Sequence, residues 1–289
     1  MHSRPVAGLV VLAILSSAQL SSTWAQGAAV KPGDSNLSAL GLSGYTLVFD
    51  EEFNTPLSVS ANGPGTRWIA HTPYGGDFGD AWFTDPGYAH SPFSIENGVL
   101  KITAWKDPSR GNHWRSGLLS SIDTKGKGFA QALGYYEARM RLPAGPGVWP
   151  AFWLAGLGNF TSPKTNSAEV DILEEYGVDS RIAHQVVHVW NVGGGQIYAL
   201  GNSSTLDGMT TGFHTYSALI KADYIHFYFD GVEQWKTATP AEAREPLYVM
   251  IDLALGGGWP IDQTPNPSHL DVDYVRVYAP PNRPVSTEE

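Results

Sequence analysis

Hydrophobic and polar residues alternate in short runs along the chain between Tyr45 and Tyr278. The segments 224–235 (YIHFYFDGVEQW) and 94–105 (SIENGVLKITAW) each hold two alternating runs, joined by Asp-Gly in the first and by Asn-Gly in the second. Runs joined by these dipeptides are typical of β-hairpins. Further runs of this kind are GYYEARMRL, AHQVVHVW, PLYVMIDLAL and LDVDYVRVYA, and a short helix is expected only around residues 240–245. The pattern predicts an all-β protein, a sandwich or jelly roll of about a dozen strands.

Alternation also shows which side chains share one face of a strand. Several predicted strands carry a face of aromatic and hydrogen-bonding residues, where an ordinary solvated face carries Ser, Thr and Lys. These co-facing pairs are Glu137 with Arg139, Trp149 with Trp153, and His188 with Trp190. Aromatic rings cover the apolar faces of sugars, while carboxylates, Arg and His bind sugar hydroxyls. A packing role is the better interpretation of any single Trp, so only the co-facing sets favour a sugar-binding groove.

The segment 169–174, EVDILE, does not fit a regular strand. Side chains alternate between faces, so Glu169 and Asp171 share one face and Glu174 falls on the other. A helix would also give an apolar stripe, but Pro and Gly interrupt the preceding segment and the following one alternates, which favours a strand. A one-residue β-bulge at Ile172-Leu173 would return Glu174 to the face of the other two carboxylates.

Three carboxylates on one face allow several kinds of chemistry. Glycoside hydrolysis with retention needs two carboxyl groups, one to attack the anomeric carbon and one to protonate the leaving oxygen. Asp171, between the two Glu residues, would hold the nucleophile in place and share a proton with it. A divalent-cation site and a merely exposed acidic strand are the alternatives, and the pattern alone leaves all three open.

Composition restricts the partners. The chain has 289 residues, a formal net charge of -10 and a pI near 5.3, which argue against nucleic acid and anionic membranes as partners. Cysteine is absent, so disulfide bonds do not contribute to stability. A neutral or cationic partner is easier to accommodate. A polysaccharide is the expected partner, and a monomer is expected.

The two ends of the chain differ from its middle. Residues 1–25 combine a basic start, a short apolar run and small residues before the end of the segment, which predicts a secretory signal peptide and a secreted protein, extracellular or periplasmic. Residues 26–44 are rich in Gly, Ser and Ala and are interpreted as a leader or linker. One domain over 45–279 and a polar tail over 280–289 complete the predicted organisation.

The segment EVDILE resembles the active-site signature of glycoside hydrolase family sixteen, a family of laminarinases, lichenases, agarases, carrageenases and xyloglucan endotransglycosylases. Further segments resemble the family in the same order: VFDEEFN, SIENGVLKIT, GYYEARMRLPAGPGVWPAFWL, FHTYSALIKADYIHFYFDG, PLYVMIDLALGGGWP and DVDYVRVY. The resemblance implies a concanavalin-like β-jelly roll of two antiparallel sheets and a retaining mechanism. It also implies that Glu169 is the nucleophile, Asp171 its helper and Glu174 the general acid/base, on the bulged version of the strand.

The resemblance implies further site residues. Six positions match residues that line sugar subsites in relatives: Glu137, Arg139, Trp149, Trp153, His188 and Trp190. A structural calcium is implied at the carbonyls of Glu52 and Gly98 and the carboxylate of Asp273, while no cofactor is expected in catalysis. Asp252 stands where many relatives carry Asn, which puts the subsite contacts in doubt.

The sequence therefore favours a secreted endo-β-glycanase that hydrolyses internal bonds of a β-1,3- or mixed β-1,3/1,4-glucan. A glycanase for a bacterial exopolysaccharide or a galactan is the nearest alternative. A non-catalytic, lectin-like jelly roll is an alternative from another class, against which the intact Glu169 and Glu174 argue.

Overall fold

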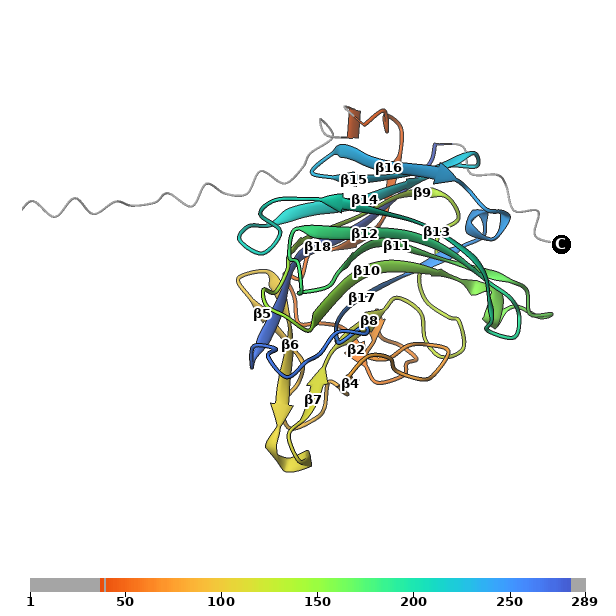
Figure 1. Cartoon of the computed structure of the whole chain (residues 1–289). Coiled ribbons are helices and arrows are strands. Elements are labelled where there is room, and N and C mark those ends of the chain that lie inside the picture. The colour runs from red at the N-terminus through yellow and green to blue at the C-terminus, as the bar shows by residue number, and fades with distance from the viewer. Residues whose placement is uncertain (1–36, 39, 282–289) are drawn as a thin grey trace, which may run out of the picture.

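The computed structural model describes residues 37–38 and 40–281, and its framework is two large sheets packed face to face (Figure 1). The predicted signal peptide and most of the predicted leader and tail lie outside the described residues. Within the described residues, no helix is long and apolar enough to cross a membrane. The two sheets confirm the predicted all-β jelly roll.

The first sheet has ten strands, and its continuous order of hydrogen-bonded neighbours runs from β16 to β4. In order across the sheet these are β16 (Val232–Ala238), β15 (Tyr224–Phe229), β14 (His214–Ile220), β9 (Gly134–Arg141), β18 (Ser268–Ala279), β6 (Val99–Asp107), β7 (His113–Ser116) and β4 (Ala81–Phe83). Two more strands join it at the side: β1 (Thr46–Glu51) pairs with β18, and β5 (Phe93–Glu96) pairs with β6. The β5–β6 and β15–β16 pairs are the two hairpins that the sequence predicts.

The second sheet has eight strands. In order these are β13 (Gln196–Thr205), β12 (Ile182–Trp190), β11 (Ser167–Glu175), β10 (Val148–Gly156), β17 (Leu247–Leu255), β8 (Leu118–Ser120), β3 (Trp68–Ile69) and β2 (Val59–Ser60). The described helices are short 3-10 turns, η1 (Pro108–Arg110), η2 (Leu157–Phe160) and η3 (Ala241–Arg244), the last at the position predicted for a helix. The strand β11, which carries EVDILE, is central, so a strand on each side holds it in register.

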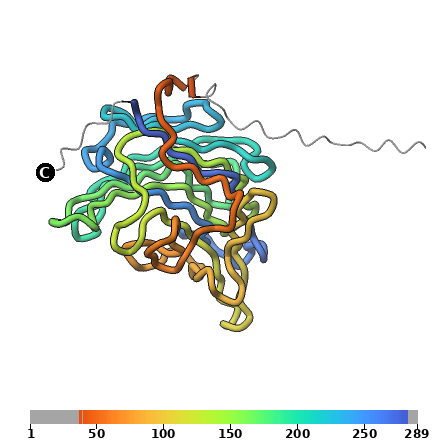
Figure 2. Tube along the Cα trace, turned by 180° about the vertical axis from the view of Figure 1, so that it is seen from behind, coloured from red at the N-terminus to blue at the C-terminus, as the bar shows by residue number. Residues whose placement is uncertain are grey.

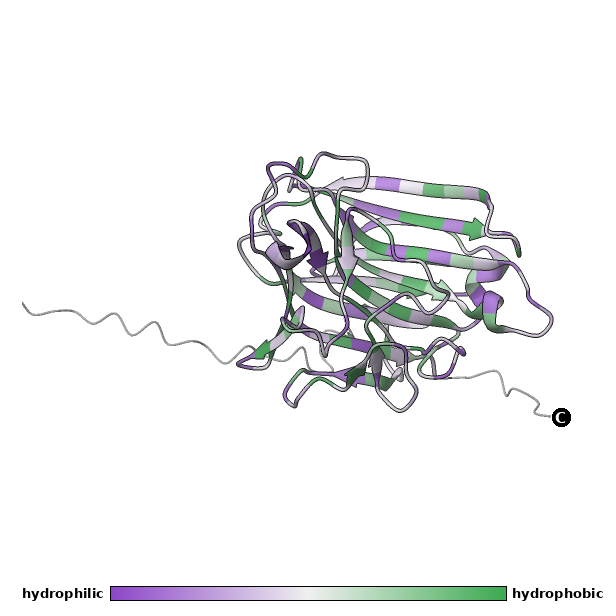
Figure 3. Cartoon of the chain, turned by 90° about the horizontal axis from the view of Figure 1, so that it is seen from below, coloured by the Kyte–Doolittle hydropathy of each residue, from purple (hydrophilic) through white to green (hydrophobic). Residues whose placement is uncertain are grey.

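Alternation along β10 separates the core from the outer face of the second sheet. Phe152 and Leu154 lie in the main core between the sheets, whereas Ala151 and Trp153 belong to a separate cluster on the opposite face. The same alternation gives the strands their banded colouring in Figure 3. The outer face of the second sheet is therefore partly apolar and aromatic, as a sugar-binding surface requires.

The folded part of the chain begins earlier than the predicted boundary at Tyr45. Leu42 is 1 % exposed and packs with Tyr135, Leu219 and Tyr278. Figure 2 shows this segment in red and orange against the sheet that carries β9 and β18. The segment looked like a linker because its few leucines are surrounded by Gly and Ser. Leu37 and Leu40 also pack against this cluster, and a few apolar residues at irregular spacing leave no periodic pattern in the sequence.

Candidate active site

A β-bulge in β11 brings the three carboxylates together. On one side of β11, Asp171 pairs with Val186 and Glu174 with His184, so Ile172 and Leu173 together stand opposite a single residue of β12. The register with β10 shifts at the same place. The extra residue reverses the alternation, and the bulge predicted at Ile172-Leu173 is confirmed.

Because of the bulge, Glu169, Asp171 and Glu174 all line one pocket on the outer face of the second sheet. The rest of its lining is almost entirely aromatic, and comprises Tyr74, Phe78, Trp149, Trp153 and Ala151. Ile172 and Leu173 are buried in the main core instead. The carboxylates are thus held by a strand whose apolar residues anchor its other side, and not by a mobile loop.

Two donors hold the carboxylate of Glu174. The Trp149 indole Nε1–H donates to Glu174 Oε1 at 3.0 Å, and the Tyr176 hydroxyl donates to the same oxygen at 3.2 Å. The Trp149 and Tyr176 rings are stacked, with centroids 5.6 Å apart. Gly177, two residues after the end of β11, donates its N–H to the carbonyl of Val148, and a Cβ there would lie 1.8 Å from the carbonyl oxygen of Gly145. The position therefore requires glycine, and the close approach of the two chains fixes the two rings beside Glu174.

Glu169 and Asp171 share an environment that disfavours two charges. Burial, followed by repulsion from Asp171, raises the pKa of Glu169 to about 8. Burial, followed by repulsion from Glu174 and Asp252, raises the pKa of Asp171 well above its ordinary value. Asp171 is only 4 % exposed, whereas Glu169 is half-buried. The more deeply buried Asp171 is therefore the better place for a proton that the two carboxyl groups share.

His188 lies against this pair from the neighbouring strand β12. Its Nε2 is 3.3 Å from Asp171 Oδ2 and 4.0 Å from Glu169 Oε1. Its Nδ1 donates to Gln196 Oε1 at 2.9 Å, since an amide oxygen can only accept. That hydrogen bond leaves Nε2 of the neutral ring as an acceptor facing Asp171, which suits a protonated Asp171.

Asp252 supports the floor of the pocket from β17. It is fully buried, accepts a hydrogen bond from Trp153 Nε1 at 2.8 Å through Oδ2, and accepts the Ala254 N–H at 3.0 Å through Oδ1. Burial raises the pKa of Asp252 to about 8. Asp252 therefore orients the Trp153 indole from below. In the structure, the Asp252 side chain is bound to the Trp153 indole and does not line the pockets of the cleft.

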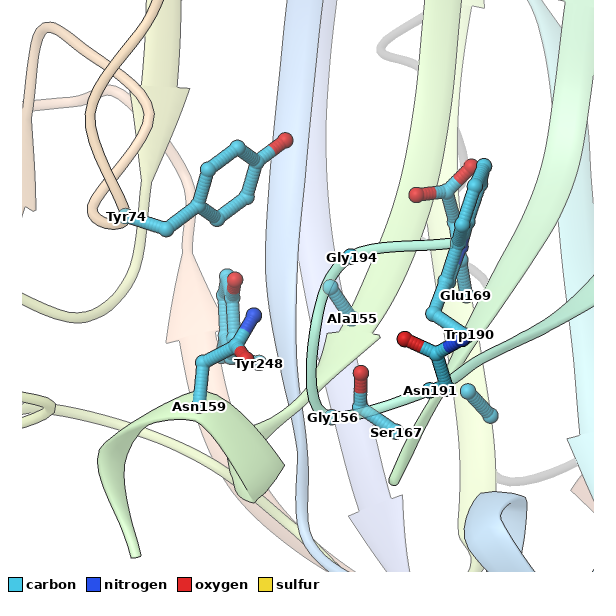
Figure 4. A pocket seen from close by; sticks show the side chains of 11 residues that line it. Tyr74, Ala155, Gly156, Asn159, Ser167, Glu169, Trp190, Asn191, Gly194 and Tyr248 are labelled. Carbon is cyan, nitrogen blue, oxygen red and sulfur yellow. The ribbon is translucent and has the colours of Figure 1, made fainter. Parts of the chain in front are cut away.

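The cleft continues past Glu169 on the side away from Glu174. Figure 4 shows this second pocket, with Trp190 beside Glu169 and with Tyr74 and Tyr248 facing them across the cavity. Asn159 and Asn191 also line it. No role was predicted from the sequence for Tyr74, Phe78, Asn159 or Tyr248, all of which line the cleft. Only Tyr248 left a usable signal, because alternation places it on the same face as Asp252.

The prediction that Glu137 and Arg139 line the sugar subsites is wrong. Both lie on β9, in the other sheet, and the residues that alternate with them are in the core between the sheets. They therefore point away from the cleft. Glu137 accepts a hydrogen bond from the Tyr135 hydroxyl at 2.8 Å, and Arg139 forms an ion pair with Asp273. The other four predicted subsite residues lie at the cleft: Trp149, Trp153 and Trp190 line its pockets, and His188 contacts Asp171.

The ion pair between Arg139 and Asp273 involves a residue of the predicted calcium site. Calcium takes six to eight oxygen ligands, of which carboxylates are the strongest. The one carboxylate of the proposed set, Asp273, is bound by the guanidinium of Arg139, and the Glu52 side chain is bound by Arg276. A calcium ion at Glu52, Gly98 and Asp273 would have to displace Arg139 from Asp273. These residues do not fit a calcium ion well in this arrangement, and the calcium remains an untested prediction.

One group in the described part of the chain has the spacing of metal ligands. Ligand atoms of Glu169, Asp171 and His188 all lie within 4.8 Å of one another. Two carboxylates and an imidazole suit several divalent metals. These ligand atoms lie at the wall of the cleft, so a metal ion bound to them would occupy the position of a substrate sugar. The aromatic lining of the cleft suits a sugar better.

A buried acid outside the cleft gives the protein a testable pH dependence. Glu175 follows Glu174 but faces the core, is fully buried, and neither of its carboxyl oxygens has a hydrogen-bond partner in the described part of the chain. Burial, followed by repulsion from Asp179, raises the pKa of Glu175 from 4.5 to about 8. Between these two values the folded protein holds a proton that the unfolded chain has released, so stability falls as pH rises.

We expect Glu175→Gln to flatten this dependence. The melting temperature of the wild type should fall between about pH 5 and pH 8 by several degrees more than that of the variant. Thermal unfolding followed by circular dichroism across this range measures it. Glu245→Gln, at an exposed position, is the matched control and should follow the wild type. Parallel curves for Glu175→Gln and the wild type would show that Glu175 does not keep its proton in the fold.

Comparison with known proteins agrees with this geometry. The model of the family described as "Glycosyl hydrolases family 16" matches residues 85–276. The chain belongs to this family of glycoside hydrolases. The catalytic strand β11 and most of the cleft lie within the matched region.

The relatives and solved structures that this chain resembles include proteins named as glucanases. The "Endo-1,3-1,4-beta-glycanase ExsH" of Rhizobium meliloti is 32% identical over 261 residues, covering 83% of this chain and 53% of that protein. The "Glucan endo-1,3-beta-glucosidase A1" of Niallia circulans is 30% identical, covering 82% of this chain and 38% of that protein. The solved structure of SCLam, "a non-specific endo-beta-1,3(4)-glucanase", matches with a TM-score of 0.66 and 26% identity, covering 82% of this chain and 92% of that one. This chain thus spans about half the length, or less, of the two curated relatives.

Proposed function

We propose that the protein is an endo-β-glycanase that hydrolyses internal bonds of a β-1,3- or mixed β-1,3/1,4-glucan with retention of configuration. The observation that carries this proposal is the bulge in β11, which turns Glu169, Asp171 and Glu174 into one aromatic-lined cleft. A binding module has no need of three converging carboxylates beneath its sugar site. The glucanase activities of the relatives support the choice of substrate.

In the first half of the proposed reaction, the carboxylate of Glu169 attacks the anomeric carbon of the sugar above it. The glycosidic C–O bond breaks, and Glu174 gives its proton to the departing oxygen. A covalent glycosyl ester on Glu169 and a free sugar hydroxyl result. In the second half, Glu174, now a carboxylate, takes a proton from water while the water oxygen attacks the same carbon. The ester breaks, and Glu169 and Glu174 regain their starting states.

The groups beside Glu169 favour its ionised form. With the shared proton on Asp171, Glu169 is ionised and ready to attack, while a proton on Glu169 would block the attack. His188 Nε2 lies 3.3 Å from Asp171 Oδ2, close enough to accept a hydrogen bond from a protonated Asp171, which would favour this arrangement. Repulsion from Asp171 helps to raise the pKa of Glu169, so a protonated Asp171 removes that repulsion and favours an ionised Glu169.

The remaining features of the proposal rest on the sequence and on the relatives. The apolar N-terminal run supports secretion, to the outside of the cell or to the periplasm. A monomer is sufficient, because one chain supplies the whole cleft described above. The reaction as written uses carboxyl groups and water alone.

Incubation with a panel of polysaccharides tests the proposed function. The purified protein should release oligosaccharides of mixed length from laminarin or lichenan, and little from agarose or xyloglucan, as followed by chromatography of the products. Release from agarose alone would indicate a galactan-type substrate. Binding to a polymer without release of products would favour a lectin-like module and contradict the proposal.

A further inference from the structure

The cleft has a third section, farthest from Glu174. A pocket lined by Pro73, Tyr74, Asn159, Lys164 and Gly194 adjoins the one that contains Glu169, and the two share Tyr74, Asn159 and Gly194. Because Tyr74 lines all three pockets, the groove is continuous from Glu174 to this end. A polysaccharide bound across Glu169 and Glu174 would extend into it.

The charge of this end differs from that of the catalytic section. Lys164 is the one Lys or Arg that lines any of these three pockets. The residues that line this end come from segments 72–76, 123–128, 157–166 and 191–195, which together contain three lysines and one acid. Asp77 directly follows the first segment and is bound to His71. The acid, Asp123, is buried, whereas Lys125, Lys127 and Lys164 are exposed and form no ion pair within the described residues. A protein of net charge -10 thus presents a locally positive surface where its cleft ends.

The loops that carry these lysines are built rigidly. Asp123 Oδ1 accepts the backbone N–H groups of Lys125 and Lys127, at 2.8 and 2.9 Å, and so closes the turn. Gly126 at the tip of the turn is pressed against Phe160, since a Cβ there would lie 2.7 Å from Phe160 Cβ. The two loops are therefore packed together. The single acidic residue, Asp123, accepts the N–H groups that shape the turn and is itself buried.

We propose that this end of the cleft binds an anionic substituent of the polysaccharide, a carboxylate or a sulfate ester, through Lys164 with support from Lys125 and Lys127. The inference rests on the proposed function, because it assumes that a polysaccharide chain lies across Glu169. A neutral glucan can accept hydrogen bonds from these lysines, but only an anionic group also gains the stronger, charge-assisted interaction. The net negative charge of the protein does not prevent this binding, because charges farther than about 8–10 Å are largely screened at physiological salt.

Chemically matched polymers and charge-reversal variants test the proposal. The substrates are laminarin, laminarin with a low degree of carboxymethylation, and lightly sulfated laminarin. The variants are Lys164→Glu and, as a control with the same change of charge, Lys221→Glu at an exposed position between β14 and β15 on the other sheet. For Lys164→Glu, kcat/KM on an anionic laminarin should fall roughly 5–10-fold relative to the wild type, with less than about a twofold change on plain laminarin. The difference should shrink at 1 M salt, where screening extends over about 3 Å.

The possible results distinguish failure of the anionic subsite from failure of the proposed function. Equal effects of Lys164→Glu on neutral and anionic laminarin, or equal effects of Lys164→Glu and Lys221→Glu, would overturn the anionic subsite. The anionic polymer on which Lys164→Glu lowers kcat/KM more shows whether the preferred group is a carboxylate or a sulfate. If the wild type cleaves none of the three polymers, the proposed function fails. The subsite is then tested by tryptophan-fluorescence titration with the same polymers, in which Lys164→Glu should weaken binding of the anionic ones alone.

Discussion

Glu169→Gln should reduce kcat/KM on a β-glucan by a factor on the order of 10⁴ or more, as expected for loss of a nucleophile. The amide has nearly the shape of the carboxylate but cannot attack the anomeric carbon, and no other carboxylate takes its place. Asp171 is closer to the sheet, nearly fully buried and repelled by its neighbours. Initial rates of reducing-sugar release, measured with fresh enzyme at several substrate concentrations, give the value.

A matched control is available on the same strand. Glu175→Gln makes the same chemical change, but its side chain faces the core and not the cleft. At pH 6 this control should keep near wild-type activity, and both variants should show wild-type circular dichroism. If Glu169→Gln kept more than a few per cent of the activity, Glu169 would not be the nucleophile.

The second large effect concerns Glu174 and depends on the substrate. Glu174→Ala should lower kcat/KM on the polysaccharide by about 10²–10⁴-fold, the usual contribution of a general acid. A dinitrophenyl β-glycoside should be affected far less, because its leaving group departs as a stable anion without a proton. Parallel measurements of kcat/KM on the two substrates give the comparison, since kcat/KM reports the step that forms the glycosyl-enzyme.

Glu169→Ala is the comparison variant for this experiment, and it should lose activity on both substrates because both require the nucleophile. Equal losses on the polymer and on the activated glycoside in Glu174→Ala would contradict the role of Glu174 as proton donor. The role of Trp149 and Tyr176 is to hold Glu174 in place, so neither is expected to give so selective an effect.

The bulge in β11 could be predicted because the order of residues in this segment does not fit a regular strand. The spacing of Glu174 from Asp171 violates strand alternation, and one extra residue is the least change that restores it. The structure has that residue, and apolar Ile172 and Leu173 anchor the bulge in the core. The pairing of Trp149 with Trp153 could also be predicted, because side chains two strand periods apart lie on the same face.

Glu137 and Arg139 show where the same reasoning ends. Their pattern along β9 is as regular as that of β10, but alternation gives only which residues share a face. It does not give the sheet to which a strand belongs or the direction in which that face points. Those depend on pairing between segments far apart in the chain, such as β9 with β18. Tyr74 was missed for a related reason, since a loop residue reaches the cleft through the path of the whole loop.

The anomeric configuration of the first product tests the central claim most directly. Proton NMR during the first minutes of hydrolysis of a laminarin oligosaccharide shows which anomer forms at the new reducing end before mutarotation. Double displacement through Glu169, with Glu174 as acid and then base, predicts that the β-anomer forms first and the α-anomer appears later. Initial formation of the α-anomer would show a single displacement by water and would contradict the mechanism built on this cleft.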